Sequence, residues 1–172
     1  AVISTSASTG VVVERAMYLS RGGRTFDSGH AAAGVPAPAS RWVLAEGATG
    51  PYFDLFVLLA NPGERAATAT LTFLLPDGHT VVRERTVAPR SRDTVWVDLE
   101  GAELADTAVS TIVTTAEDTP IVVERAMWWP GRPATWHEAH ASMGATLDGI
   151  TWALADGEDD PSRGLETYVL VA

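Results

Sequence analysis

The chain contains an internal duplication, and this feature limits its possible folds more than any other. Residues 1–50 align with residues 111–160 at a constant offset of 110, and 16 of the 50 aligned pairs are identical. Roughly three or four identities are expected by chance at this composition, so the match marks a true repeat. With a shift of two residues it continues from residues 53–60 onto residues 165–172. The chain therefore holds about one and a half copies of a unit of roughly 110 residues, the size of one domain.

Alternation of apolar and polar residues dominates the chain and predicts β-strands. Between residues 67 and 75, apolar side chains alternate with threonines, which is typical of a strand with one buried face. Pro76-Asp77-Gly78 supplies a turn, which predicts a hairpin with the run at 79–87. Only residues 101–106 could form a helical turn. Because short strand-like runs follow one another with turns between them, the sequence predicts an all-β, antiparallel, immunoglobulin-like β-sandwich. The remaining strand patterns lie at 52–60, 95–99, 111–115 and 121–129.

The starting point of the repeat unit decides the domain boundaries. We favour a unit that begins near Arg41, because this phase keeps the hairpin-rich middle together with the strand pattern at 121–129. Strands outside this unit have unpaired edges, and we expect them to pair with each other or to be covered by a neighbouring repeat. The expected division is residues 1–40 as the C-terminal part of a preceding repeat, 41–150 as a complete β-sandwich repeat and 151–172 as the first strand or strands of a following repeat.

Composition and charge exclude several classes of function. The net charge of −10 and the pI near 4.7 disfavour binding to nucleic acids and to anionic membranes. No apolar run approaches the ~18 residues of a membrane-spanning helix. The chain has no cysteine, which removes disulfides, thiolate metal sites and cysteine nucleophiles together.

The most closely repeated segment is Val-Val-Glu-Arg-Ala-Met, at residues 12–17 and 122–127. On a strand Glu124 and Arg125 point to opposite faces, so they cannot pair with each other. Each lies among apolar residues on its own face, and a charge in such surroundings needs a partner. A histidine that occupies the same position in both copies is the expected partner of each glutamate. We therefore predict structural ion pairs, with the candidate residues Glu14, Arg15, His30, Glu124, Arg125 and His140.

Two segments contain potential metal ligands, but neither has the spacing of a known motif. His137-Glu138-Ala139-His140 is one residue shorter than the H-E-x-x-H of zinc proteases, and the other copy has Asp27 and Ser28 in place of its first two residues. The acidic segment at 156–160 lacks the full calcium-loop pattern and is typical of a solvated turn. Nucleophile-elbow, phosphate-loop and dinucleotide motifs are also missing. We expect no metal, no cofactor and no catalytic residue.

Tryptophans are the remaining candidates for binding. Trp128, Trp129 and Trp136 cluster near one loop, and their faces could stack on sugar rings. Trp128 and Trp129 point to opposite sides of their strand, so at least one is expected in the core. Trp42 and Trp152 open the repeated Trp-x-Leu-Ala segment and are expected to be buried anchors at the unit boundary. Packing is the main expectation for these residues, and glycan stacking is the alternative for the first three.

The motifs together resemble a tandem β-repeat of secreted or cell-surface actinobacterial proteins. The resemblance covers nearly the whole chain and rests on Val-x-Glu-Arg-Ala-Met followed by Tyr or Trp, on Trp-x-Leu-Ala-Glu/Asp-Gly and on the Asn-Pro-Gly turn at 61–63. The second copy departs from the pattern only mildly, with Asp156 where Glu is preferred and Ala139 where Gly is preferred. The resemblance implies export and tandem arrays, and it implies no catalytic residue.

These observations lead to one main expectation of function and one alternative. The main expectation is a non-enzymatic extracellular repeat that acts as a structural spacer or adhesion-type stalk. Its expected partners are neighbouring repeats of the same protein, or other copies that associate through edge strands. The alternative is a carbohydrate-binding module that uses exposed tryptophans on cell-surface polysaccharide.

Overall fold

The computed structural model describes residues 2–6, 8–21 and 23–172, and every regular element in this part of the chain is a β-strand or a short 3-10 turn. The described residues contain no helix with the length and apolarity that crossing a membrane requires. The strands are β1 (Glu14–Arg21), β2 (Arg24–Ala33), β3 (Arg41–Leu44), β4 (Asp54–Asn61), β5 (Ala67–Leu74), β6 (Thr80–Val87), β7 (Ser91–Trp96), β8 (Ser110–Thr114), β9 (Val122–Trp129) and β10 (Glu138–Met143).

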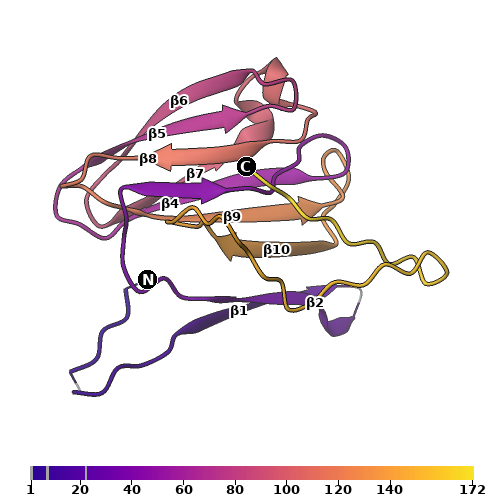
Figure 1. Cartoon of the computed structure of the whole chain (residues 1–172). Helices are drawn as coiled ribbons and strands as arrows, with labels where there is room; N and C mark the ends of the chain where they lie inside the picture. Colours follow the sequence, from indigo (N-terminus) through magenta and orange to yellow (C-terminus); the bar gives the residue numbers. More distant parts are fainter. Residues whose placement is uncertain (1, 7, 22) are drawn as a thin grey trace.

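Two four-stranded sheets pack face to face and form a β-sandwich (Figure 1). One sheet has the strand order β10-β9-β4-β7, and the other has the order β3-β8-β5-β6. All the strand pairs in them are antiparallel. The chain crosses repeatedly from one sheet to the other, as it does in immunoglobulin-like sandwiches. The all-β, antiparallel sandwich predicted from the sequence is therefore confirmed.

The core lies between the two sheets and is built from alternate positions of each strand. In β5 every second residue is fully buried and the threonines between them face outwards, because successive side chains of a strand point to opposite sides. β4 contributes in the same way from the opposite sheet. Among the fully buried side chains of these two strands are Leu55, Val57, Leu59, Leu71 and Phe73.

The predicted strand at residues 95–99 is only partly correct. β7 ends at Trp96, and Val97–Leu99 form a 3-10 turn. The Asp98 carboxylate explains the turn, because it accepts hydrogen bonds from the backbone N–H groups of Gly50 (3.1 Å) and Leu55 (2.9 Å). The alternation of apolar and polar residues could not reveal this turn, because Asp98 bonds to residues that are far away in the sequence. The helical turn expected within residues 101–106 is present at Ala102–Leu104.

The duplicated segments fold into the same hairpin. In β1–β2 Met17 pairs with His30, and in β9–β10 their twins Met127 and His140 pair in the same way. Neighbouring pairs along the two hairpins keep this register. Their surroundings differ, however, because β9 lies between β10 and β4, whereas β1 pairs only with β2 among the described strands. The hairpin of the first copy thus has a free edge where that of the second copy carries β4.

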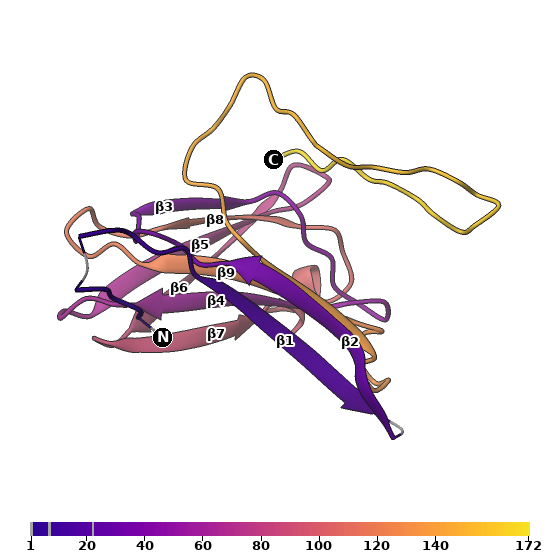
Figure 2. The same cartoon turned by 90° about the horizontal axis from the view of Figure 1, so that it is seen from below.

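The β1–β2 hairpin lies against the sheet that contains β9 and β10, with β2 nearest to β10 (Figures 1 and 2). A salt bridge joins Arg15 of β1 to Glu124 of β9 at 2.7 Å. The Ser28 hydroxyl donates a hydrogen bond to the carbonyl of His137 at 2.9 Å. The hairpin of one copy is therefore docked on the sheet of the other by polar contacts.

Residues 151–172 differ from the expectation that they form a strand of a following repeat. The structure describes all of them, and they contain one isolated bridge, between Asp160 and Leu165, but no strand. A long loop of this segment projects to one side beyond the sandwich in both views (Figures 1 and 2). A strand needs a neighbour for its backbone hydrogen bonds, and this segment has no sheet beside it.

We predict that Phe73→Ala lowers the free energy of unfolding by about 3–5 kcal/mol, because it opens a cavity in a fully buried position. Thr68→Ala, on the exposed face of the same strand, is the matched control and should cost less than about 1 kcal/mol. Urea denaturation of both variants measures the difference. Equal losses in the two variants would contradict the orientation of β5.

Candidate functional site

A buried arginine forms the centre of the most connected polar cluster. The side chain of Arg125 is only 7% exposed, and its guanidinium contacts the Glu46 carboxylate at 2.5 Å. The same guanidinium donates to the carbonyl of Glu46 at 3.1 Å. Its other terminal nitrogen lies 3.0 Å from Nε2 of His140. The cluster therefore ties the loop after β3 to strands β9 and β10.

The pairing register decides which residues meet in this cluster. His140 lies opposite Met127 on β9, and Arg125 is two residues away on the same face. Glu124 points to the other face and bonds to Arg15 instead. The expected pairing of Glu124 with His140 is therefore wrong, because the strand alternation that separates Glu124 from Arg125 also separates Glu124 from His140.

Electrostatics favour the charged forms of the pair at the centre of the cluster. The pKa of the Glu46 carboxyl lies below its ordinary value, first because His140 offers it a hydrogen bond and then because of the positive charge of Arg125, while burial opposes the shift. Burial lowers the pKa of Arg125, and the Glu46 charge offsets part of this effect. Nε2 of His140 lies 3.5 Å from the Glu46 carboxylate, so it can donate to Glu46 when it carries a hydrogen and accept from Arg125 when it does not.

The twin cluster in the first copy is incomplete. His30 is partly buried between the two hairpins, and its Nε2 has no hydrogen-bond partner among the described residues. Burial is the main cause that lowers the pKa of His30, and the charge of Arg15 adds to it. Arg15 bonds to Glu124, while Glu14 lies exposed on β1. Glu46 gives Arg125 and His140 a carboxylate partner. Among the described residues, no residue at the twin position of Glu46 gives such a partner to Arg15 and His30.

An aromatic cluster covers the outer face of the β10-β9-β4-β7 sheet. Trp136, from the loop before β10, lies 5.0 Å from Trp128 and 6.3 Å from Trp96 between ring centroids. Phe56 of β4 packs on Trp96 at 5.0 Å and edge-on to Trp136 at 5.9 Å. The guanidinium of Arg132 lies 4.7 Å over the Trp96 ring, a cation–π distance. The structure therefore brings Trp128 and Trp136 together, with two further aromatic residues that the sequence reasoning did not single out.

Trp129 lies apart from this cluster. Its ring is 6.2 Å from Phe53 and 5.6 Å from His140, on the face that Arg125 also occupies. This position follows from the alternation of the strand, which sends Trp128 and Trp129 to opposite sides. The three tryptophans considered for glycan stacking thus do not form one surface.

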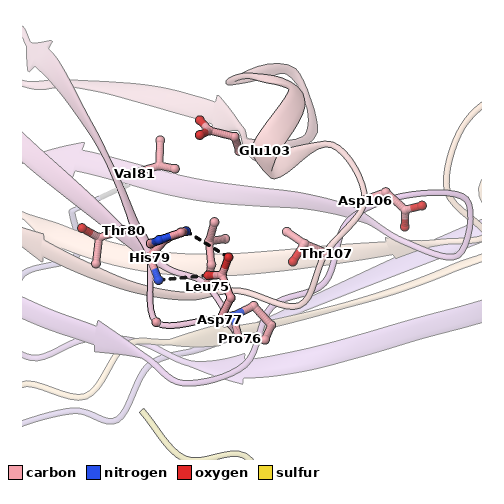
Figure 3. Close-up of a pocket in the computed structure, with 10 residues that line it drawn as sticks. Leu75, Pro76, Asp77, His79, Thr80, Val81, Glu103, Asp106 and Thr107 are labelled. Atoms are coloured by element: carbon pink, nitrogen blue, oxygen red, sulfur yellow. Dashed lines mark hydrogen bonds and ion pairs between the residues drawn. The ribbon is translucent and has the colours of Figure 1, made fainter.

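A surface hollow lies beside the turn between β5 and β6 (Figure 3). Its floor includes Asp77 and His79, whose side chains lie 3.0 Å apart and are largely exposed. The Asp77 carboxylate also accepts the backbone N–H of His79, which is the main cause of its lowered pKa. These polar groups stabilise the turn. Within the described part of the chain, no three His, Cys, Asp or Glu side chains gather around one point as metal ligands would.

Glu46 is the site residue that sequence reasoning missed. Its signal was present in the sequence, because the repeated Trp-x-Leu-Ala-x-Gly segment carries an acid at the same position in both copies, Glu46 and Asp156. A carboxylate that recurs within an apolar motif indicates a buried cationic partner. The loop that places Glu46 against Arg125 could not be inferred from strand periodicity.

Comparisons with known proteins extend the description of the fold. No family model and no curated protein matches the chain. A solved structure from Thermotoga maritima, "Thermotoga maritima 1070", is similar with a TM-score of 0.55 and 19% identity over 65% of this chain and 97% of the other. The Anabaena sensory rhodopsin transducer has a TM-score of 0.46 and 22% identity over 54% of this chain and 99% of the other. At this identity the first likeness concerns the fold alone.

We predict that Glu46→Gln lowers the free energy of unfolding by about 3 kcal/mol, the lower end of the range for breaking a buried ion pair, because it leaves Arg125 without its counter-charge. The matched control is Asp156→Asn, the twin position, which is exposed and accepts a hydrogen bond from its neighbouring backbone N–H. In dilute protein the control should leave stability unchanged. Chemical denaturation of both variants makes the comparison.

The same pair has a predicted pH dependence. Because the folded pKa of Glu46 lies below the ordinary value of 4.5, its stabilisation is complete above pH 4.5 and is lost as the pH falls through the lower folded pKa. E46Q should lack this part of the acid-induced loss. Parallel acid profiles of the two proteins would contradict the assignment.

Proposed function

We propose that the chain is a non-enzymatic extracellular β-sandwich repeat that acts as a structural spacer or stalk. This proposal rests on the contacts that the repeated charged residues make in the structure. Arg125, His140 and Glu46 all come from repeated motifs, and they bond to one another. Residues that recur in each copy and hold the fold together are those expected of a building block.

The docked hairpin gives the proposal a second support. β1–β2 and β9–β10 are the same structural element in two copies, and the Arg15–Glu124 salt bridge joins them. Contacts between copies of one element are the basis of tandem-repeat architectures, in which each unit is stabilised by its neighbours. Neighbouring repeats are accordingly the proposed partners, and export to the cell surface is the setting that the sequence resemblance implies.

A spacer should lengthen by a constant step for each added unit. The test protein joins residues 1–150 to residues 41–172, which inserts one further copy in the phase of the duplication. We expect its maximum dimension in small-angle X-ray scattering to exceed that of the original chain by roughly 35 Å, the diameter of a compact unit of this size. Both proteins are measured at the same low concentration.

A much smaller increase would mean that the added unit folds back on its neighbour, and the spacer proposal would then be wrong. Loss of cooperative unfolding in the longer protein would also count against it, because the inserted segment would not be a folding unit.

Carbohydrate binding is the second candidate, and the outer-face aromatic cluster is what favours it. Trp136 and Trp128 lie side by side on one face of a sheet, within reach of Trp96 and Arg132. Such a surface offers ring faces and a hydrogen-bonding guanidinium to a sugar chain. In this alternative the partner is a cell-surface polysaccharide.

A glycan array tests this candidate directly. If the cluster binds sugars, Trp136→Ala should reduce the array signal at least about tenfold, a loss of roughly 1.4 kcal/mol or more. The matched control is Trp152→Ala, which removes an exposed tryptophan outside the cluster and should keep the signal. The absence of binding by the unaltered chain would remove carbohydrate recognition from consideration.

A further inference from the structure

We propose that the segment from residue 149 to residue 172 of one copy docks on β1 and His30 of a second copy and adds a strand to its two-stranded sheet. The inference rests on the proposed function as a repeat and names the residues through which copies join. It follows from three contacts within the complete sandwich. The residues equivalent to each contact are also present in the other copy, but among the described residues they do not all meet.

The first contact is the anchor made by Trp42. This side chain is 2% exposed, and its indole N–H donates to the carbonyls of Ala39 (3.1 Å) and Ile121 (2.9 Å). It therefore joins the start of β3 to the residue that precedes β9. Both acceptors lie in segments that have twins at the offset of 110.

The twin anchor is half formed. The indole N–H of Trp152 donates to the carbonyl of Gly149 at 2.9 Å, and Gly149 is the twin of Ala39. The twin of the other acceptor is Val11, which is 60% exposed, while Trp152 itself is 68% exposed. The Trp152 indole is therefore oriented by one of the two contacts and remains exposed to solvent. It can bind a second chain that offers the carbonyl of Val11.

The second contact is the carboxylate in the buried cluster. Glu46 bonds to Arg125 and contacts His140 in the complete unit. Their twins Arg15 and His30 stand on the docked hairpin, where Nε2 of His30 has no partner among the described residues. The twin carboxylate is Asp156, exposed on the segment that follows Trp152. Asp156 from a second copy would supply the acid that this site lacks.

The third contact is a strand pair. In the complete unit Phe56 of β4 lies opposite Ala126 of β9. Applying the two offsets of the duplication places Tyr168 opposite Ala16, on the edge of β1 that carries no strand. The exposed apolar residues of the segment match buried ones in β4: Val57 is 0% exposed, and its twin Val169 is 67% exposed. Pairing would bury these side chains and satisfy the free backbone groups of β1.

The starting points of the twin strands agree with a missing neighbour. β9 begins at Val122, which pairs with Ala60 of β4. β1 begins at Glu14, two residues later than the twin position Val12, which is 91% exposed. A strand placed beside β1 would extend the start of β1 to the twin of the residue at which β9 begins.

A second copy is the occupant that all three contacts specify. The two docking surfaces differ, since one copy offers the segment and the other offers the hairpin, so the interface is head-to-tail. Each copy carries both surfaces and can therefore join two neighbours. In dilute solution Arg15 keeps Glu124 as its partner, and on docking it gains Asp156 in competition with that salt bridge.

Cysteine trapping tests the predicted register, because the chain contains no cysteine of its own. Single variants A16C and Y168C are mixed and oxidised. Directly opposed residues of an antiparallel pair have Cα atoms about 4.5–5.5 Å apart, within the range that a disulfide spans. We expect the mixed disulfide dimer to be the main product and to exceed either homodimer.

The register control mixes A16C with V169C, which moves one cysteine to the next residue and to the opposite face of the strand. Its yield should be at least about fivefold lower. Equal yields in the two mixtures would show random collision and overturn the proposal. A double variant A16C/Y168C that closes within single chains, together with no product in the mixture, would show that each chain covers its own hairpin and would also overturn it.

Sedimentation of proteins without cysteine gives an independent measurement. Trp152→Ala and Asp156→Ala should each raise the dissociation constant of self-association about tenfold, while Asp159→Ala, an exposed acid nearby, should leave it unchanged. Absence of association by the unaltered chain up to millimolar concentration would contradict the docking. This result can be distinguished from failure of the spacer proposal. The length of the protein that joins residues 1–150 to residues 41–172 is measured at a concentration at which copies do not associate.

Discussion

The pairing of β4 with β9 is the interaction on which the rest of the structure depends. It joins a strand from the middle of the unit to the repeated hairpin, and so places Arg125 and Met127 against the core. Where this pairing exists, the hairpin belongs to a four-stranded sheet and is buried on one side. Where it does not, the same hairpin forms a separate two-stranded sheet that is held by polar contacts. Similar local sequence therefore occurs in two different structural settings, and the neighbouring strand decides between them.

The charged cluster depends on that sheet. A guanidinium that is almost fully buried is stable only with a counter-charge, and Glu46 provides it from a loop outside the sheet. Because Glu46 and Arg125 lie far apart in the sequence, the ion pair fixes the loop after β3 only once β9 is in place. The cluster thus links the correct packing of two distant segments, and its residue types recur in the sequence of both copies although only one copy assembles it.

Much of the fold could be predicted from the sequence, because it depends on local patterns. Alternation in residues 67–75 and the Pro76-Asp77-Gly78 turn were sufficient for the β5–β6 hairpin, and the duplication indicated that its two copies would have similar structures. Features that depend on distant partners could not be predicted in this way. Asp98 bonds to the start of β4 and to the loop before it just after β7 ends, and the partner of His140 is set by register. The segment at 151–172 has strand-forming residues and contains no strand, because a strand also requires a sheet beside it.

The difference between the twin strands can be measured directly by amide hydrogen exchange, resolved residue by residue with NMR. In β9 the amides that face β4 and those that face β10 are both hydrogen-bonded, whereas in β1 only those that face β2 have a strand partner. In dilute solution we predict strong protection throughout β9 and, in β1, protection of alternate amides only. Raising the protein concentration should then protect the remaining amides of β1. Equal protection of the two strands in dilute protein would contradict the view that one hairpin is complete and its twin awaits a neighbour.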